Sequence, residues 1–195
     1  MIDDRRMAWW LTAILGGIML TGCAEPPVAA PTSYASYESH DNTQTFKCDY
    51  PEGWEVEGGG KTNAWAKFSS GSALIEVRTD LSGSLLGDIA RAAVDEENAD
   101  TDPVAQVHAG DLASAQAKFS GYAEPGAAEK LECSLGPARR SEFTASGSFG
   151  ASVHGYRMTI LAHDRRVVAY CSCSESDWNT LKPAFDHVAE SFTRP

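Results

Sequence analysis

Residues 46–54 read Phe46-Lys47-Cys48-Asp49-Tyr50-Pro51-Glu52-Gly53-Trp54. Apolar and polar side chains alternate along the first five positions, which is the period-two pattern of a strand with one buried face. Pro-Glu-Gly then interrupts the alternation, and Trp54 and Val56 resume it. We therefore predict an antiparallel hairpin with its turn at residues 51–53.

The next segment repeats this pattern. Residues 65–68 and 73–77 flank Ser69-Ser70-Gly71 and are predicted to form a second strand pair, with Glu76 and Arg78 on its polar face.

Two helices are predicted to follow. The apolar spacing becomes helical over residues 86–94. Asp102 and Pro103 then form an N-cap and first-turn pair for a second helix, which Gly121 terminates.

Strand patterns return near residues 131–135, 141–145, 156–160 and 167–173, and residues 163–166 form the turn between the last two. An amphipathic helix closes the chain. Ser174 or Ser176 is expected to cap this helix, and Pro183 to kink it or mark its start. Its apolar face is formed by Leu181, Phe185, Val188, Ala189 and Phe192. The order strands, helices, strands, helix predicts an α+β domain built on an antiparallel sheet.

A family resemblance rests on residues 46–54 together with Phe185-Asp186-His187-Val188-Ala189-Glu190-Ser191-Phe192. These stretches resemble the PsbP-like family, which includes photosystem II extrinsic proteins, a Ran-binding nuclear import factor and several bacterial lipoproteins. The resemblance covers about Thr43 to Phe192 and implies a single domain with an antiparallel sheet sandwiched between helices. Because the matching residues are apolar or turn-forming, the resemblance implies no particular activity, and no role in oxygen evolution is carried over.

The start of the chain has the pattern of a lipoprotein signal peptide. Arg5 and Arg6 precede an apolar run over residues 8–20, which is too short for a membrane-spanning helix. Leu20-Thr21-Gly22-Cys23 follows it as a lipobox. We predict that Cys23 becomes the acylated N-terminus, carrying palmitate-type chains. A non-lipidated signal peptide and a twin-arginine signal are the alternatives.

The predicted organisation is therefore a lipoprotein signal peptide over residues 1–22, a Pro/Ala/Ser-rich tether over residues 23–42 and one PsbP-like domain over residues 43–195. The acylated N-terminus would hold the protein in the cell membrane or outer membrane, with its domain on the periplasmic or extracytoplasmic side. The formal net charge of −11 disfavours nucleic acid and anionic lipid surfaces as partners.

Four cysteines remain after Cys23, namely Cys48, Cys133, Cys171 and Cys173. An even set in an oxidising compartment favours disulfides. Cys171 and Cys173 share one face of a strand, where a bond between them would strain the backbone. We therefore expect Cys48 or Cys133 to be linked to Cys171 or Cys173. Buried free thiols, or metal or redox chemistry, are the alternatives.

Five arginines carry most of the positive charge in the C-terminal part of the chain. They form a candidate partner-binding set: Arg139, Arg140, Arg157, Arg165 and Arg166. The alternative is that they balance neighbouring carboxylates on exposed strand faces and on the tip of the last hairpin.

No pattern of comparable specificity points to catalysis. The acidic residues between Asp95 and Asp102 lack the spacing of a calcium loop, and the five histidines lack a zinc-binding spacing. We expect no catalytic residue, no metal and no cofactor. The predicted function is a lipid-anchored, non-enzymatic binding or assembly module of the bacterial cell envelope with an unknown envelope protein partner. The alternative is a thiol- or metal-dependent envelope enzyme that uses Cys171 and Cys173.

Overall fold

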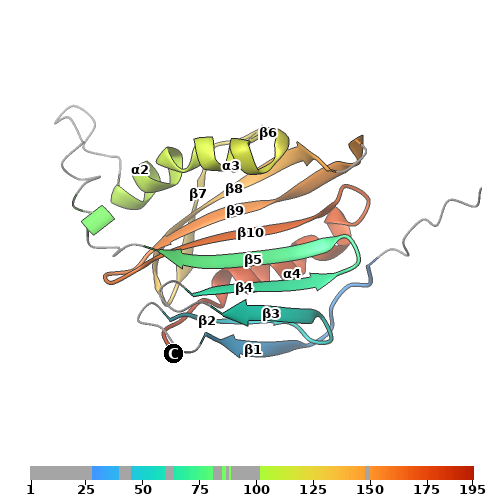
Figure 1. Ribbon diagram of the computed structural model, residues 1–195, viewed down its shortest axis with the longest axis horizontal. Coiled ribbons are helices and arrows are strands. Elements are labelled where there is room, and N and C mark those ends of the chain that lie inside the picture. Colours follow the sequence, from blue (N-terminus) through green and yellow to red (C-terminus); the bar gives the residue numbers. More distant parts are fainter. Residues whose placement is uncertain are drawn as a thin grey trace, which may run out of the picture.

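A large antiparallel sheet forms the centre of the protein (Figure 1). The computed structural model describes residues 28–39, 45–59, 64–80, 85–86, 88, 102–147 and 150–195. In this part of the chain the large sheet has eight strands in the order β3-β4-β5-β10-β9-β8-β6, with β7 also paired to β8. The strands are β3 (Glu55–Gly59), β4 (Trp65–Ser70), β5 (Ala73–Asp80), β6 (Ser120–Ala123), β7 (Glu129–Cys133), β8 (Gly136–Ser146), β9 (Ser152–Leu161) and β10 (Arg166–Ser174).

Helices lie on both faces of this sheet. Figure 1 shows α4 (Trp178–Glu190) behind the sheet, while α2 (Pro103–Gly110) and α3 (Leu112–Lys118) run along its upper part on the other face. A small second sheet pairs β1 (Tyr34–Glu38) with β2 (Lys47–Pro51). The predicted α+β fold, with an antiparallel sheet sandwiched between helices, is confirmed.

The two faces have separate apolar cores, because alternate residues of each strand point to opposite faces. The main core lies between the sheet, α4 and the small sheet, and contains Phe46, Phe68, Ile160 and Phe185. The smaller core lies beneath α3 and is largely aromatic. Its buried members are Ala115, Tyr122, Phe143, Ala145, Val168 and Tyr170.

The hairpin predicted at residues 51–53 is wrong. Strand β2 pairs with β1, in a register that places Tyr34 opposite Pro51, and β3 pairs with β4. The turn instead moves the chain from the small sheet to the large one, and Gly53 takes a φ of 85° there, which a residue with a side chain rarely adopts. The hairpin predicted around Ser69–Gly71 is confirmed as β4–β5.

Part of the predicted tether belongs to the domain. Strand β1 comes from residues 34–38, and Val28 packs against the main core. Tyr37 contacts the rings of Phe46 and Phe68, with centroids 5.8 and 5.3 Å away. The domain boundary predicted at Thr43 is therefore too late, because the aromatic side chains of this segment complete the apolar core.

The helix predictions are corrected in detail. Asp102 caps α2 as predicted, accepting a hydrogen bond from the Ala105 amide at 2.8 Å, but the helix is divided at Asp111 into α2 and α3. Asp177 is the N-cap of α4 in place of Ser174 or Ser176, and Pro183 lies inside the helix. Of the helix predicted over residues 86–94, only residues 86 and 88 are described, and both are helical.

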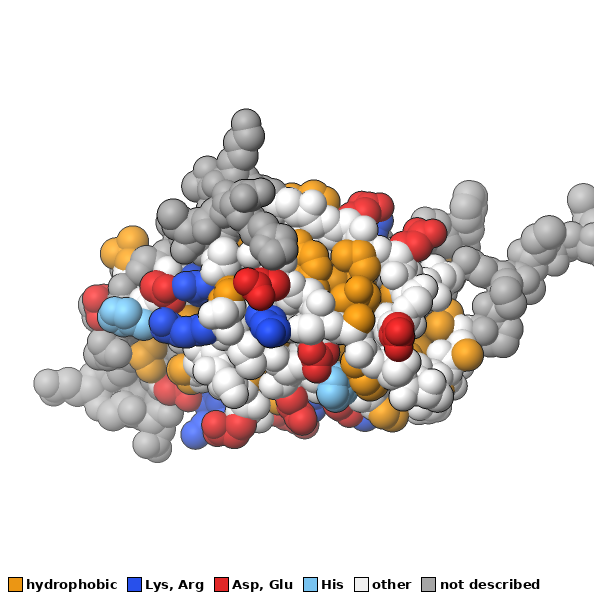
Figure 2. Space-filling view, turned by 90° about the horizontal axis from the view of Figure 1, so that it is seen from below, with side chains coloured by type: hydrophobic (Ala, Val, Ile, Leu, Met, Phe, Trp, Pro, Cys, Tyr) orange, Lys and Arg blue, Asp and Glu red, His pale blue; other side chains and the backbone are white. Residues whose placement is uncertain are grey.

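The surface on the side of β1 and β2 mixes acidic and basic side chains around an apolar patch (Figure 2). Among the helices of the described residues, none combines the length and the apolar character needed to cross a membrane.

We expect Tyr37→Ala to lower the free energy of unfolding by about 2 kcal/mol, because it removes a half-buried ring from the main core. Urea unfolding monitored by circular dichroism measures this loss. Ser36→Ala, an exposed change on the same strand, is the control and should stay within about 0.5 kcal/mol. Equal stability of the two variants would mean that β1 does not stabilise the domain and belongs to the tether.

Candidate functional site

A groove crosses the face of the large sheet opposite α4 and ends at α3. It consists of two cavities of about 470 and 210 Å³ that share Arg78 and Asp80. We call it the strand groove. The side chains used below are Trp65, Lys67, Glu76, Arg78 and Asp80 in the larger cavity, and Asp111, Ser114, Lys118, Arg166 and Tyr170 in the smaller one.

The strand pairing explains why these side chains stand together. Trp65 lies opposite Arg78, and Lys67 lies opposite Glu76, on the neighbouring strands β4 and β5. Directly paired residues of antiparallel strands point to the same face, so the four side chains surround one patch of sheet. The alternating residues Ala66 and Val77 are buried on the other face. The predicted polar face of Glu76 and Arg78 is confirmed.

Ion pairs fix most charges of the strand groove. Lys118 Nζ lies 2.5 Å from a Glu76 carboxylate oxygen. Arg166 donates two hydrogen bonds to Asp80, at 2.7 and 2.6 Å, and a third to Asp111 at 2.7 Å. These hydrogen bonds raise the pKa of Arg166, with that to Asp80 contributing most. Arg166 thereby joins the end of β5 to the junction of α2 and α3.

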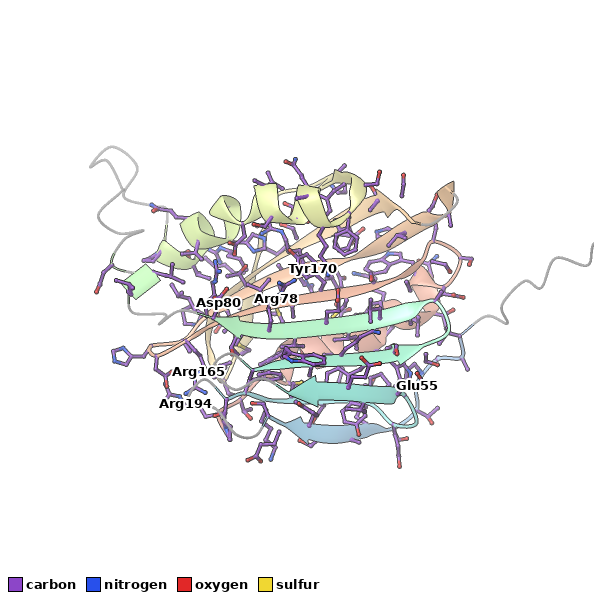
Figure 3. The ribbon with its side chains drawn as sticks, in the orientation of Figure 1. Glu55, Arg78, Asp80, Arg165, Tyr170 and Arg194 are labelled. Atoms are coloured by element: carbon purple, nitrogen blue, oxygen red, sulfur yellow. The ribbon has the colours of Figure 1, made fainter. Side chains whose placement is uncertain are left out.

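Arg78 differs from its neighbours. Its side chain is exposed, and it has no hydrogen-bond or ion-pair partner among the described residues. Figure 3 shows it beside Asp80 and Tyr170 over β5 and β10. Trp65, its direct cross-strand neighbour, is 41 % exposed. The strand groove therefore presents one unpaired guanidinium next to an accessible indole, in a chain whose net charge is −11.

A buried polar cluster lies further along the same face, under α2. Arg157 is 1 % exposed. It donates hydrogen bonds to Glu124 at 2.7 Å and to the carbonyl oxygen of His108 at 2.6 Å. The His108 ring is hydrogen-bonded to Thr159 and Ser141, each at 2.9 Å. Burial, reinforced by the charge of Arg157, lowers the pKa of His108 to about 3, so the ring is neutral. With its polar atoms occupied within the protein, the cluster holds α2 against the sheet.

The five arginines of the predicted partner-binding set do not form one site. Arg139, Arg157 and Arg166 lie on the face of α2 and α3, where Arg139 pairs with the helix cap Asp102. Arg140 lies on the opposite face, bonded to Asp186 at 2.7 Å and stacked 4.2 Å from the ring centre of Tyr156.

Arg165 and Arg166 were expected to be exposed at the tip of the last hairpin. The β9–β10 hairpin does turn at this point, but the expected exposure of the two side chains is wrong. Arg165 is 7 % exposed and donates to the carbonyl oxygen of Thr45 and to Asp164. Arg166 is held between two carboxylates, as described above. Both side chains bind segments that are distant in the sequence. The prediction of an exposed hairpin tip did not include such contacts.

The four cysteines of the domain are free thiols in this structure. Cys48, Cys171 and Cys173 are buried, and Cys133 is half-buried. Burial raises the pKa of Cys171 and of Cys173 to about 12. Cys171 and Cys173 lie on one face of their strand as predicted, and this is the face covered by α4. The disulfide that we expect between Cys48 or Cys133 and Cys171 or Cys173 stays a prediction.

Other expectations concern parts that are not described. Cys23 and the acidic residues 95–100 lie outside the described residues. Within the described ranges, His, Cys, Asp and Glu side chains nowhere gather in threes in a way that could hold a metal ion.

Several groove residues were missed by sequence reasoning. Trp65 was assigned to a strand without a role, and Asp80, Lys118 and Tyr170 were not singled out. The available signal was that Trp65 alternates with Ala66 and Phe68, so that a large aromatic residue lies on the outward face of a strand whose inward residues are apolar. His108 was not singled out among the five histidines, although it is 2 % exposed.

Comparison with known structures agrees with this geometry. Cyanobacterial PsbP (CyanoP) from Synechocystis sp. PCC 6803 is similar with a TM-score of 0.57 and 17% identity, over 90% of this chain and 99% of that one. The protein therefore has the PsbP-like fold, as the resemblance implied. No protein-family model and no curated protein matches the sequence.

Two further structures are similar at lower scores. A protein of unknown function from Pseudomonas aeruginosa has a TM-score of 0.48 and 13% identity, over 83% of this chain and 98% of that one. LpqN of Mycobacterium tuberculosis, described as involved in cell envelope biogenesis, has a TM-score of 0.46 and 11% identity, over 82% and 90% of the two chains. At these identities the likeness concerns the fold alone.

We expect Arg166→Glu to destabilise the protein by about 3 kcal/mol, because it leaves Asp80 and Asp111 beside a like charge in a part-buried site. Chemical unfolding compares it with Arg194→Glu, whose side chain is 57% exposed and whose cost should stay below about 1 kcal/mol. A cost for Arg166→Glu no larger than that of the control would mean that the arginine only balances surface charge.

The pKa of His108 predicts an acid-sensitive fold. The folded state keeps the ring neutral down to about pH 3, whereas the unfolded chain binds a proton near the ordinary value of 6.5. Proton uptake therefore favours unfolding between these values, and stability should fall as the pH decreases through this window.

The variant His108→Gln should flatten that dependence, because an amide can hydrogen-bond to Ser141 and Thr159 without titrating. Urea unfolding between pH 4 and pH 7 measures the slope, with the exposed His163→Gln as control. An unchanged slope in His108→Gln would assign the acid sensitivity to other groups.

Proposed function

We propose that the protein is a lipid-anchored, non-enzymatic binding or assembly module of the bacterial cell envelope. The observation that carries this proposal is the sequence Leu20-Thr21-Gly22-Cys23 after a short apolar run. Acylation of Cys23 would anchor the protein by more than one chain, which gives stable membrane attachment.

The length of the linker supports a position close to the membrane. The described domain begins at Val28, which packs against the main core. Four residues lie between Cys23 and Val28. An extended chain covers at most about 3.6 Å per residue, so the five steps from Cys23 to Val28 span about 18 Å at most. The domain would therefore stay close to the lipid surface, with residues 28–33 at its membrane-proximal end.

The strand groove supports binding over catalysis. Its carboxylates are held in ion pairs with Arg166 and Lys118, so their positions are fixed and their charges are compensated. Its available groups are the Arg78 guanidinium and the Trp65 ring. Such groups bind a ligand through hydrogen bonds and ring contacts and are not typical catalytic groups. We take the strand groove as the binding surface of the module.

The thiol-enzyme alternative has weaker support. A catalytic cysteine needs an accessible thiolate, which requires a depressed pKa. Cys171 and Cys173 are buried beneath α4, and the pKa of each is raised to about 12.

Replacement of the lipidation residue tests the anchor. Cys23→Ala should abolish fatty-acid labelling and either release the domain from membranes or leave the precursor uncleaved, because the acyl acceptor is lost. Labelling with a fatty-acid analogue and membrane fractionation in the native organism measure both effects. Cys133→Ser should label like the wild type. Mass spectrometry that finds an unmodified Cys23 or a retained signal in the wild-type protein would refute the anchor.

A further inference from the structure

We propose that the strand groove binds a carboxylate-bearing sugar, with the carboxylate on Arg78 and one face of the sugar ring on Trp65. This inference rests on the proposed function as a binding module and adds the chemical class of its ligand.

The charge balance of the strand groove selects a monoanion. Its other cations are occupied, because Arg166 and Lys118 bind the carboxylates of the groove and Lys67 lies 3.9 Å from Glu57. Arg78 is the remaining cationic group of the groove, and it has no hydrogen-bond or ion-pair partner among the described residues. A planar guanidinium binds a carboxylate through two parallel hydrogen bonds. A dianion such as a phosphate monoester would additionally be repelled by Asp80 and Glu76 nearby.

Trp65 supplies a platform at the same point. Its ring is 41 % exposed, and the strand register places it directly beside Arg78 on the same face of the sheet. An indole offers a flat apolar surface with a polar edge. The C–H face of a pyranose matches such a surface, and a carboxylate on the ring would then reach the guanidinium.

The surrounding groups suit hydroxyls better than a peptide. Extended peptides join a sheet at a free edge, where main-chain groups are available. Strand β5 is paired on both sides, with β4 and β10, so the floor of the groove offers no such edge. Glu76 and Asp80 instead present carboxylates fixed by ion pairs, and Ser114 adds a hydroxyl. Fixed acceptors of this kind bind hydroxyl donors, in which a sugar is rich.

The size of the site agrees with this class. The larger cavity, of about 470 Å³, lies within the range of small-molecule sites, and it continues into the smaller one towards α3. Arg78 and Asp80 stand where the two meet, so a short oligosaccharide would place one unit on each side of the arginine.

Titration calorimetry on the full mature protein in detergent micelles tests the proposal. The probes are a short β-1,4-linked oligoglucuronate, a cello-oligosaccharide of the same length and an acetylated oligoglutamate peptide. The wild type should bind the oligoglucuronate at least about tenfold more tightly than the neutral sugar, because only the charged sugar can form the charge-assisted contact with Arg78.

The variants separate the two contacts. Arg78→Gln should remove the preference for the charged sugar, and Arg78→Lys should restore part of it by keeping the charge without the planar fork. Arg194→Gln, an exposed arginine near Arg165 and away from the groove (Figure 3), is the matched control and should bind like the wild type. Trp65→Ala should weaken both sugars by about tenfold. Val56→Ala, at a residue 42 % exposed on the opposite face of the sheet, should weaken neither.

Failure of the saccharide to bind the folded wild type would overturn the proposal, as would an undiminished preference in Arg78→Gln. Binding of the oligoglutamate alone, with the same dependence on Arg78, would overturn it in favour of an acidic peptide. None of these results bears on the membrane anchor, which the Cys23→Ala experiment tests separately. Absence of the lipid anchor together with intact sugar binding would refute the anchor and keep this site.

Discussion

The Arg157 guanidinium lies 1 % exposed in the middle of β9, where an uncompensated charge would cost several kcal/mol. Its hydrogen bonds to Glu124, the Tyr122 hydroxyl and the carbonyl oxygen of His108 compensate it and at the same time fix two segments, α2 and the end of β6, in place. The position of α2 follows from these bonds, and α3 continues from α2 after Asp111. Because α3 forms the wall of the strand groove, the geometry of the site depends on a buried charge that does not itself line the groove.

The two faces of the sheet are stabilised in different ways. Beneath α4 the contacts are apolar, and Phe46, Phe185 and Phe192 are each fully buried there. Under α2 and α3 the helices are short, and polar contacts supplement a small aromatic core. Such contacts fix position well, but their strength depends on protonation, which is why acid should loosen this face first. The main core has few titrating groups and should be less sensitive to pH.

The sequence predicted the strands with alternating patterns, such as β4 and β5, the apolar run of β10 and the amphipathic face of α4. It placed β2 in the wrong pair, because the partner strand β1 comes from a Pro- and Ala-rich stretch with a weak pattern of its own. The arginines were judged by their position in the chain, whereas the partners that bury them, such as Thr45 for Arg165 and Asp80 for Arg166, lie 120 and 86 residues away. Trp65 could be assigned to a strand but not to a groove, since the wall at α3 is a tertiary feature.

The ion pairs of the strand groove also explain how an open sheet face is kept available. An exposed sheet face made of apolar residues would attract other chains, and covering it would remove the site. Here Lys118 and Glu76, and Arg166 with Asp80 and Asp111, fill the face with compensated charge that remains hydrated and cannot pack into a dry core. Trp65 and Arg78 then remain as the groups of the groove that are accessible to a ligand. A ligand that covers the ring and neutralises the guanidinium would leave the ion pairs around it undisturbed, so binding would require little rearrangement of the sheet.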